Sequence, residues 1–180
     1  GALVAALAVR TATWPIPDAP QRLSMVLPPS LPLAFGWTPG LSLAISPDGR
    51  QIAYAAQNLD VPPGPTRNQL YVRSLDNIAV RALPGTEGAA QPFSSPDGQW
   101  VAYVRQWSDP MTDRRYSNIW LVKSDGSMHR PLTSGKFTDE SPAWSPDGKR
   151  IAYVSTRSGS GQLYVRWMDT GESYPLTNGP

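Results

Sequence analysis

The stretch "SPAWSPDGKRIAYVS", residues 141–155, contains a turn signal followed at once by an apolar strand. Related stretches occur at 42–56, "SLAISPDGRQIAYAA", and at 91–105, "QPFSSPDGQWVAYVR". Their SPDG tetrads begin at residues 46, 95 and 145, which are 49 and 50 residues apart. Four strand-length apolar segments recur around each tetrad. A four-strand unit with this period predicts the blades of a β-propeller.

Each tetrad has the residues that a tight hairpin turn needs. The proline sets φ near −65°, the aspartate accepts backbone hydrogen bonds, and the glycine adopts positive φ. The three carboxylates belong to different repeats, so we interpret them as turn residues rather than as a catalytic or metal cluster. The structural turn residues are therefore Ser46, Pro47, Asp48, Gly49, Ser95, Pro96, Asp97, Gly98, Ser145, Pro146, Asp147 and Gly148.

The predicted fold is all-β, a propeller fragment of about three four-stranded blades that form an incomplete ring. The strands after the tetrads are apolar on both faces, which is typical of a sheet stacked between two others. Three blades are fewer than the usual four to eight, so the two outer faces would lack a partner. We expect the remaining blades in a longer parent chain; a dimer or trimer that closes the ring is the alternative.

Three regions are predicted along the chain. Residues 1–21 contain the apolar run "GALVAALAV" and a Pro-rich linker, interpreted as the remnant of a membrane segment or signal peptide. Residues 22–40 are expected to hold a further strand, Arg22–Leu27, that could pair with the last blade of a ring. Residues 41–180 form the blades, at about 41–89, 90–140 and 141–180.

Composition excludes several classes of function. The 180 residues carry a formal charge of +2 with scattered basic residues, which does not predict nucleic-acid binding. The chain has no cysteine, so disulfides and thiolate metal sites are excluded. The N-terminal apolar run favours a periplasmic or other extracytoplasmic location, with a membrane tether N-terminal to residue 1.

The repeats resemble the WD-like propeller repeats of the TolB type, whose hallmark is a strand, SPDG, and then "IAY" or a close variant. The resemblance covers about residues 41–180. Residues 43–104 resemble the extracytoplasmic sensor propeller that follows a membrane helix in some bacterial Ser/Thr kinases and regulators. Residues 139–179 resemble the N-terminal propeller of prolyl oligopeptidase-family serine peptidases. Fold resemblance alone does not decide between these functions.

Motifs for catalysis are missing from the sequence. No G-x-S-x-G elbow, phosphate loop or metal motif occurs, and we expect no cofactor and no metal. The single histidine, His129, has no histidine at the equivalent positions of the other repeats. We interpret it as an ordinary, partly exposed strand residue and predict no catalytic residue in the chain.

Loop length is the one functional asymmetry among the repeats. Between their second and third strands, the first two repeats insert "QNLDVPPGPTRN" (57–68) and "QWSDPMTDRRYS" (106–117), whereas the third has only "TRSGSG". Long loops on a rigid scaffold commonly carry recognition. The second insert mixes aromatic and charged side chains as binding hot spots do. The candidate partner-binding residues are Trp107, Asp109, Arg114, Arg115 and Tyr116; a solvated loop whose Trp107 caps a neighbouring blade is the alternative.

We therefore predict a non-catalytic binding or scaffold propeller with protein or peptide partners. It would act as the sensor or interaction part of a larger protein such as a membrane-anchored kinase or regulator. The alternative is the gating propeller of a prolyl oligopeptidase-family serine peptidase, where the ring restricts access of peptides to a separate active site.

Overall fold

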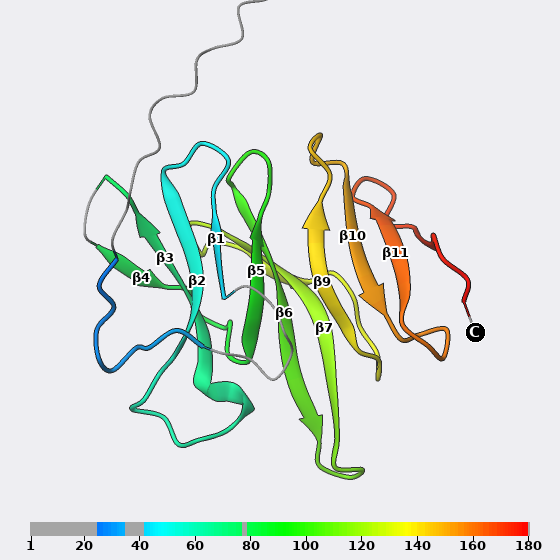
Figure 1. Ribbon diagram of the computed structural model, residues 1–180, viewed down its shortest axis with the longest axis horizontal. Helices are drawn as coiled ribbons and strands as arrows, with labels where there is room; N and C mark the ends of the chain where they lie inside the picture. The colour runs from blue at the N-terminus through cyan, green and yellow to red at the C-terminus, as the bar shows by residue number, and fades with distance from the viewer. Residues whose placement is uncertain (1–24, 35–41, 77–78, 180) are drawn as a thin grey trace, which may run out of the picture.

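The computed structural model describes residues 25–34, 42–76 and 79–179, and in these it contains three four-stranded antiparallel sheets (Figure 1). Each sheet is formed by four strands consecutive in the chain, as predicted. The first sheet comprises β1 (Leu43–Ile45), β2 (Gln51–Gln57), β3 (Asn68–Ser74) and β4 (Val80–Ala82). The second comprises β5 (Ala89–Ser94), β6 (Trp100–Asp109), β7 (Arg114–Lys123) and β8 (His129–Pro131). The third comprises β9 (Asp139–Trp144), β10 (Arg150–Ser155), β11 (Gln162–Trp167) and β12 (Ser173–Pro175).

The SPDG tetrads form the same turn in all three sheets. In the second sheet, the Ser95 hydroxyl donates to Asp97 Oδ1, and Asp97 Oδ1 also accepts the Gln99 N–H at 3.0 Å. The Ser95 hydroxyl in turn accepts the Trp100 N–H at 2.9 Å. These hydrogen bonds lower the pKa of Asp97, with that from Ser95 the main cause. The predicted role of the tetrad residues as structural turns fits this geometry.

The glycine of each tetrad has the positive φ that the turn requires. The three angles are nearly identical, at 70°, 69° and 70° for Gly49, Gly98 and Gly148. An L-residue with a Cβ rarely adopts this conformation. The turn between the first two strands of each sheet is therefore encoded by four adjacent residues.

The second sheet packs between the other two, and its central strands are buried on both faces (Figure 1). One of its faces contacts the first sheet through Val101, Tyr103 and Val122. Its other face contacts the third sheet through Ala102, Ile119 and Leu121. Successive side chains in a strand point to opposite faces, so strands apolar at every position are the consequence of a neighbour on each side.

A threonine after the last strand of each sheet accepts a backbone hydrogen bond from the third strand of that sheet. The Leu70 N–H donates to Thr86 Oγ1 at 3.0 Å, and the equivalent Ile119 N–H donates to Thr133 Oγ1 at 2.9 Å. Leu163 and Thr177 make the same bond in the third sheet, at 2.9 Å. This repeated contact was not part of the sequence interpretation, because the threonines lie at different distances from their tetrads.

The N-terminal predictions are only partly covered by the structure. Residues 1–21, the expected membrane or signal remnant, lie outside the described residues, as do residues 22–24 of the expected strand. The described part of that strand, Met25–Leu27, forms no strand and packs against the first sheet. Within the described residues, no helix has the length and apolar character needed to cross a membrane.

Candidate functional site: the β6–β7 hairpin

The second insert forms a long hairpin rather than the loop that the sequence predicted. The antiparallel pairing of β6 with β7 continues beyond the ends of the neighbouring strands β5 and β8, as far as Asp109 and Arg114 (Figure 1). It leaves a short turn at 110–113. Trp107 is paired directly with Tyr116, and their ring centroids are 5.0 Å apart. Aromatic cross-strand pairs stabilise strands, which explains why this polar-looking segment stays in the sheet. The first insert does form a loop, with a short 3-10 turn at Pro65–Arg67.

Asp109 ties the hairpin to the segment that connects the second and third sheets. Its carboxylate is 2.6 Å from Lys136 Nζ, and its other oxygen accepts the Met111 N–H at 3.0 Å. The hydrogen bond from Lys136 lowers the pKa of Asp109, and the same bond raises the pKa of Lys136. Asp109 is 6% exposed, so it is a structural contact of the hairpin rather than a residue available to a partner.

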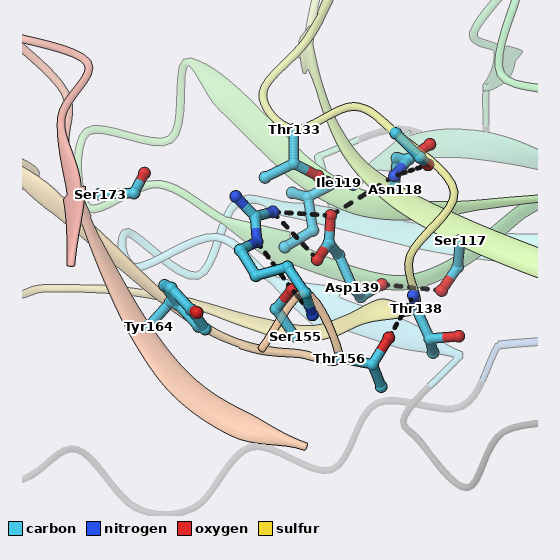
Figure 2. Close-up of polar contacts among 12 residues, drawn as sticks. Ser117, Asn118, Ile119, Thr133, Thr138, Asp139, Ser155, Thr156, Tyr164 and Ser173 are labelled. Carbon is cyan, nitrogen blue, oxygen red and sulfur yellow. Dashed lines mark hydrogen bonds and ion pairs between the residues drawn. The ribbon is translucent and has the colours of Figure 1, made fainter. Parts of the chain in front are cut away.

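Trp107 belongs to a buried polar network between the second and third sheets. Its indole N–H donates to Asn118 Oδ1 at 3.0 Å, and the Asn118 amide donates to Gly135 O at 3.2 Å and to Asp139 Oδ2 at 3.4 Å. Figure 2 shows Asp139 among these partners, with the Ser117 hydroxyl donating to its backbone oxygen at 2.9 Å. These bonds connect β6 and β7 of the hairpin to the segment around the start of β9.

An ion pair at the centre of this network compensates the buried charge. Arg157 Nη2 lies 3.2 Å from both carboxylate oxygens of Asp139, whose side chain is fully buried. The guanidinium also lies over the rings of Phe137, Tyr153 and Tyr164, at 5.2–5.7 Å from their centroids. A buried carboxylate without such a partner would be strongly unfavourable.

The structure divides the five predicted partner-binding residues into two groups. Trp107 and Asp109 are held by contacts within the chain, and Tyr116 is half-buried against Trp107. Arg114 and Arg115 are exposed beside the turn, together with Met111, which is 90% exposed and which the sequence interpretation did not single out. The surface available to a partner is therefore the tip, Met111, Arg114 and Arg115, and the remaining residues orient it.

A groove that the sequence interpretation did not include runs along the first strands of the three sheets. It is an open groove of about 850 Å³, lined mostly by apolar side chains that include the tetrad prolines. Gln91 and Ser141, at equivalent positions on its wall, have φ of 48° and 55°, which is rare for residues other than glycine. The Ser141 N–H donates to Gln91 Oε1 at 2.7 Å and joins the two strands here.

Comparison with known proteins identifies the family. The pattern that defines the TolB beta propeller domain matches residues 33–179. The chain belongs to this family. The TolB-type repeats and the all-β propeller architecture expected from the sequence are thus confirmed.

The relatives that match this TolB-type propeller include a protein named as a peptidase and a protein named as a TolB homolog. It is 37% identical over 104 residues to the uncharacterized peptidase YuxL of Bacillus subtilis, covering 57% of this chain and 16% of that protein. It is 34% identical over 133 residues to the protein TolB homolog of Chlorobium luteolum, covering 74% of this chain and 28% of that protein. The structure of putative TolB from Agrobacterium tumefaciens has a TM-score of 0.59 at 24% identity, covering 78% of this chain and 50% of that one. The chain thus matches less than a third of the length of these two curated relatives.

His129 in the TolB-type propeller has a specific structural contact. Its Nε2 atom is 2.6 Å from the Tyr103 hydroxyl, and the two rings stack with centroids 5.8 Å apart. Within the described residues, the buried hydroxyls of the equivalent Tyr54 and Tyr153 have no hydrogen-bond partner. His129 is half-buried, in line with its interpretation as a strand residue, and it satisfies a hydroxyl that the other two repeats leave unpaired.

We expect the stability of the protein to fall in mild acid because of His129. Burial, aided by the Arg105 guanidinium and opposed by Glu87, lowers the pKa of His129 below its ordinary value of 6.5. Protonation therefore favours the unfolded chain, so the contribution of His129 is present above pH 6.5 and is lost as pH falls through the lowered pKa. Thermal melts between about pH 7 and about pH 5 should show a falling melting temperature.

Two variants separate this effect from general acid destabilisation. His129→Gln should flatten the melting-temperature profile over this pH range, because glutamine does not titrate. Tyr103→Phe removes the hydroxyl but keeps the imidazole, so it should lower the melting temperature and retain the fall with acid. A His129→Gln profile as steep as that of the wild type would contradict the assignment.

Proposed function

We propose that this chain is a non-catalytic binding segment of a TolB-type propeller and that the β6–β7 hairpin is its recognition element. The observation that carries the proposal is the hairpin itself. Its strands continue beyond the ends of β5 and β8, the Asp109–Lys136 ion pair holds its outer end beside the turn, and its tip exposes Met111, Arg114 and Arg115. A rigidly positioned loop tip with exposed apolar and arginine side chains is suited to a protein or peptide partner.

The proposal places the chain outside the cytoplasm, as the sensor or interaction part of a larger, membrane-anchored kinase or regulator. It is supported by the apolar N-terminal run "GALVAALAV" and by the resemblance of residues 43–104 to sensor propellers of that kind. The dispersed charge of +2 favours a protein partner over a nucleic acid.

Peptide binding tests the role of the tip. The purified chain is applied to an array of short synthetic peptides of acidic, basic and aromatic composition, and the strongest binder is titrated by fluorescence anisotropy. Met111→Ser combined with Arg114→Ala and Arg115→Ala should weaken binding about tenfold or more, because hot-spot side chains supply most of the energy of an interface. The melting temperature should stay unchanged, since these side chains are exposed.

The matched control changes basic residues at the opposite end of the sheets. Arg50→Ala with Lys149→Ala also removes two exposed positive charges, and it should leave peptide affinity unchanged. Absence of any binding peptide, or equal losses in both sets of variants, would contradict the assignment of the tip.

A second candidate function is the gating propeller of a serine peptidase. It is favoured by the identity to peptidase YuxL and by 38% identity over 69 residues to dipeptidyl-peptidase 5 of Porphyromonas gingivalis. In either case we propose that this chain is not itself catalytic. Fluorogenic aminoacyl and dipeptidyl substrates should show no turnover; turnover that His129→Ala abolishes would overturn this part of the proposal.

A further inference from the structure

The first insert, which the proposed function does not use, forms a closed loop between β2 and β3. The pairing of these strands ends at Gln57 and Asn68, and residues 58–67 connect them. The Asn58 N–H donates to Arg67 O at 2.9 Å, and Arg67 Nε donates back to Asn58 O at 3.2 Å. These two bonds close the base of the loop at the end of the sheet.

Neighbouring segments hold the base of this loop from both sides. The Leu59 N–H donates to Ser30 O at 3.1 Å, in the N-terminal segment that packs on the first sheet. On the other side, Asn68 O accepts the Gly88 N–H at 2.8 Å, and the turn Pro65–Arg67 lies against β6. The loop therefore projects in a defined direction, at the same end of the sheets as the tip of the β6–β7 hairpin (Figure 1).

The outer part of the loop, residues 61–64, is called the proline strip below. Its sequence is "VPPG", and all four residues are exposed. Val61 is 36% exposed, and the nearby Leu59 is 41% exposed. The third repeat joins the same two strands with only "TRSGSG", so the pairing of the strands does not require the proline strip. An exposed apolar segment that the sheet does not need is a candidate contact for a partner.

The proline strip has few accessible backbone conformations. Proline fixes φ near −65°, and a residue that precedes a proline is restricted to extended backbone. Val61 and Pro62 both precede a proline. Gly64 is extended, with φ of 167° and ψ of 174°. A segment restricted in this way loses little conformational entropy when a partner binds it.

The proline strip offers hydrogen-bond acceptors and almost no donors. Three of residues 61–65 are prolines, which have no backbone N–H. The Val61 N–H already donates to Asn58 O, at 3.2 Å. In the part of the chain that the structure describes, no hydrogen bond reaches the carbonyl oxygens of residues 61–63. A complementary surface must therefore supply donors next to apolar area.

Tryptophan and tyrosine side chains combine these two properties. Each has a flat apolar ring and one donor, the indole N–H or the phenol O–H. Proline-rich segments commonly bind to grooves lined by aromatic side chains. We propose that the proline strip is a second docking element, which binds a groove lined by Trp and Tyr side chains on a protein partner. This assignment does not depend on the role proposed for the hairpin tip, because the two elements share no residue.

Peptide selection tests the composition of the partner surface. A phage-displayed library of random short peptides is panned on the purified 180-residue chain and, in parallel, on the Pro62→Ala/Pro63→Ala variant. Peptides retained only by the wild type should be several-fold enriched in Trp and Tyr relative to the library. Two outcomes would overturn the proposal: no peptide whose retention requires the prolines, or proline-dependent peptides without aromatic enrichment.

The affinity of the strongest selected peptide tests the contacts of the proline strip. In fluorescence anisotropy, Pro62→Ala with Pro63→Ala should weaken binding about tenfold or more, whereas Thr66→Ala, an exposed change in the same loop, should not. A peptide with Phe for Tyr and N-methylindole for Trp keeps the rings and lacks the donors. It should bind about threefold or more weakly, and equal affinity of the two peptides would contradict the role of the carbonyl oxygens.

Gly64→Glu provides a second variant in case the loss of two prolines alters the loop. A Cβ added at Gly64 would meet no atom within 4 Å, and the backbone there is extended, so a glutamate can be accommodated. It should weaken peptide binding at an unchanged melting temperature, and full affinity would overturn the proposal. Met111→Ser with Arg114→Ala and Arg115→Ala should leave this binding unchanged. A loss in that variant alone would assign the peptide to the hairpin tip and overturn the role of the proline strip.

Discussion

Asp139→Ala is expected to lower the free energy of unfolding by about 3 kcal/mol or more. The substitution leaves the Arg157 guanidinium, whose side chain is 25% exposed, without the carboxylate that neutralises it. It also removes one of the two acceptors of the Asn118 amide, whose other acceptor is Gly135 O. Urea unfolding followed by tryptophan fluorescence measures the change, because the chain contains seven tryptophans.

An exposed ion pair and a double-mutant cycle control this measurement. Arg150→Ala breaks the Arg150–Asp147 contact, whose side chains are 48% and 44% exposed, and should cost no more than about 1 kcal/mol. The double variant Asp139→Ala/Arg157→Ala should lose less stability than the sum of the two single variants. Additive losses would show that the two residues act independently, contrary to the geometry.

Ile119→Ala is expected to cost about 2–5 kcal/mol, whereas Leu163→Ala should cost under about 1 kcal/mol. The two residues occupy the same position in the second and third sheets, and each donates its N–H to a threonine. Ile119 is fully buried between the second and third sheets, and Leu163 is 37% exposed on the outer face. Only the former leaves a cavity when it is shortened.

Equal losses for the two alanine variants would contradict this interpretation, because they would mean that the outer face of the third sheet is covered in solution. Comparison at several protein concentrations distinguishes the sources of cover. A loss at Leu163 that grows with concentration would indicate cover by other molecules, and a constant loss would indicate cover from within the chain.

The turns and strands could be predicted from the sequence because their determinants are adjacent in the chain. Proline, aspartate and glycine in each SPDG tetrad fix a hairpin through bonds that span at most five residues. The predicted three groups of four strands agree with the structure. The extent of β6 and β7 was missed, since it depends on the Trp107–Tyr116 pair across the hairpin.

The candidate site could be predicted only in part. Composition drew attention to the segment from Trp107 to Tyr116, but it could not separate residues that anchor the hairpin from residues that face solvent. Asp109 is buried because Lys136, 27 positions away, lies beside it. The groove along β1, β5 and β9 was missed for the same reason, since its wall combines residues from three sheets.

By itself, the sequence determined the repeating unit of this protein. The unit is a four-stranded antiparallel sheet whose first two strands are joined by an SPDG turn, and it occurs three times. Those features depend on backbone preferences and hydrogen bonds over a few residues, so local composition is sufficient to predict them. Within the described residues, only the tertiary structure decided which of several equivalent apolar faces is buried by a sheet and which by Met25–Leu33. Residues at equivalent positions of different repeats have different surroundings. Their burial depends on which segment packs against each face of the sheet, and that segment is distant in the sequence.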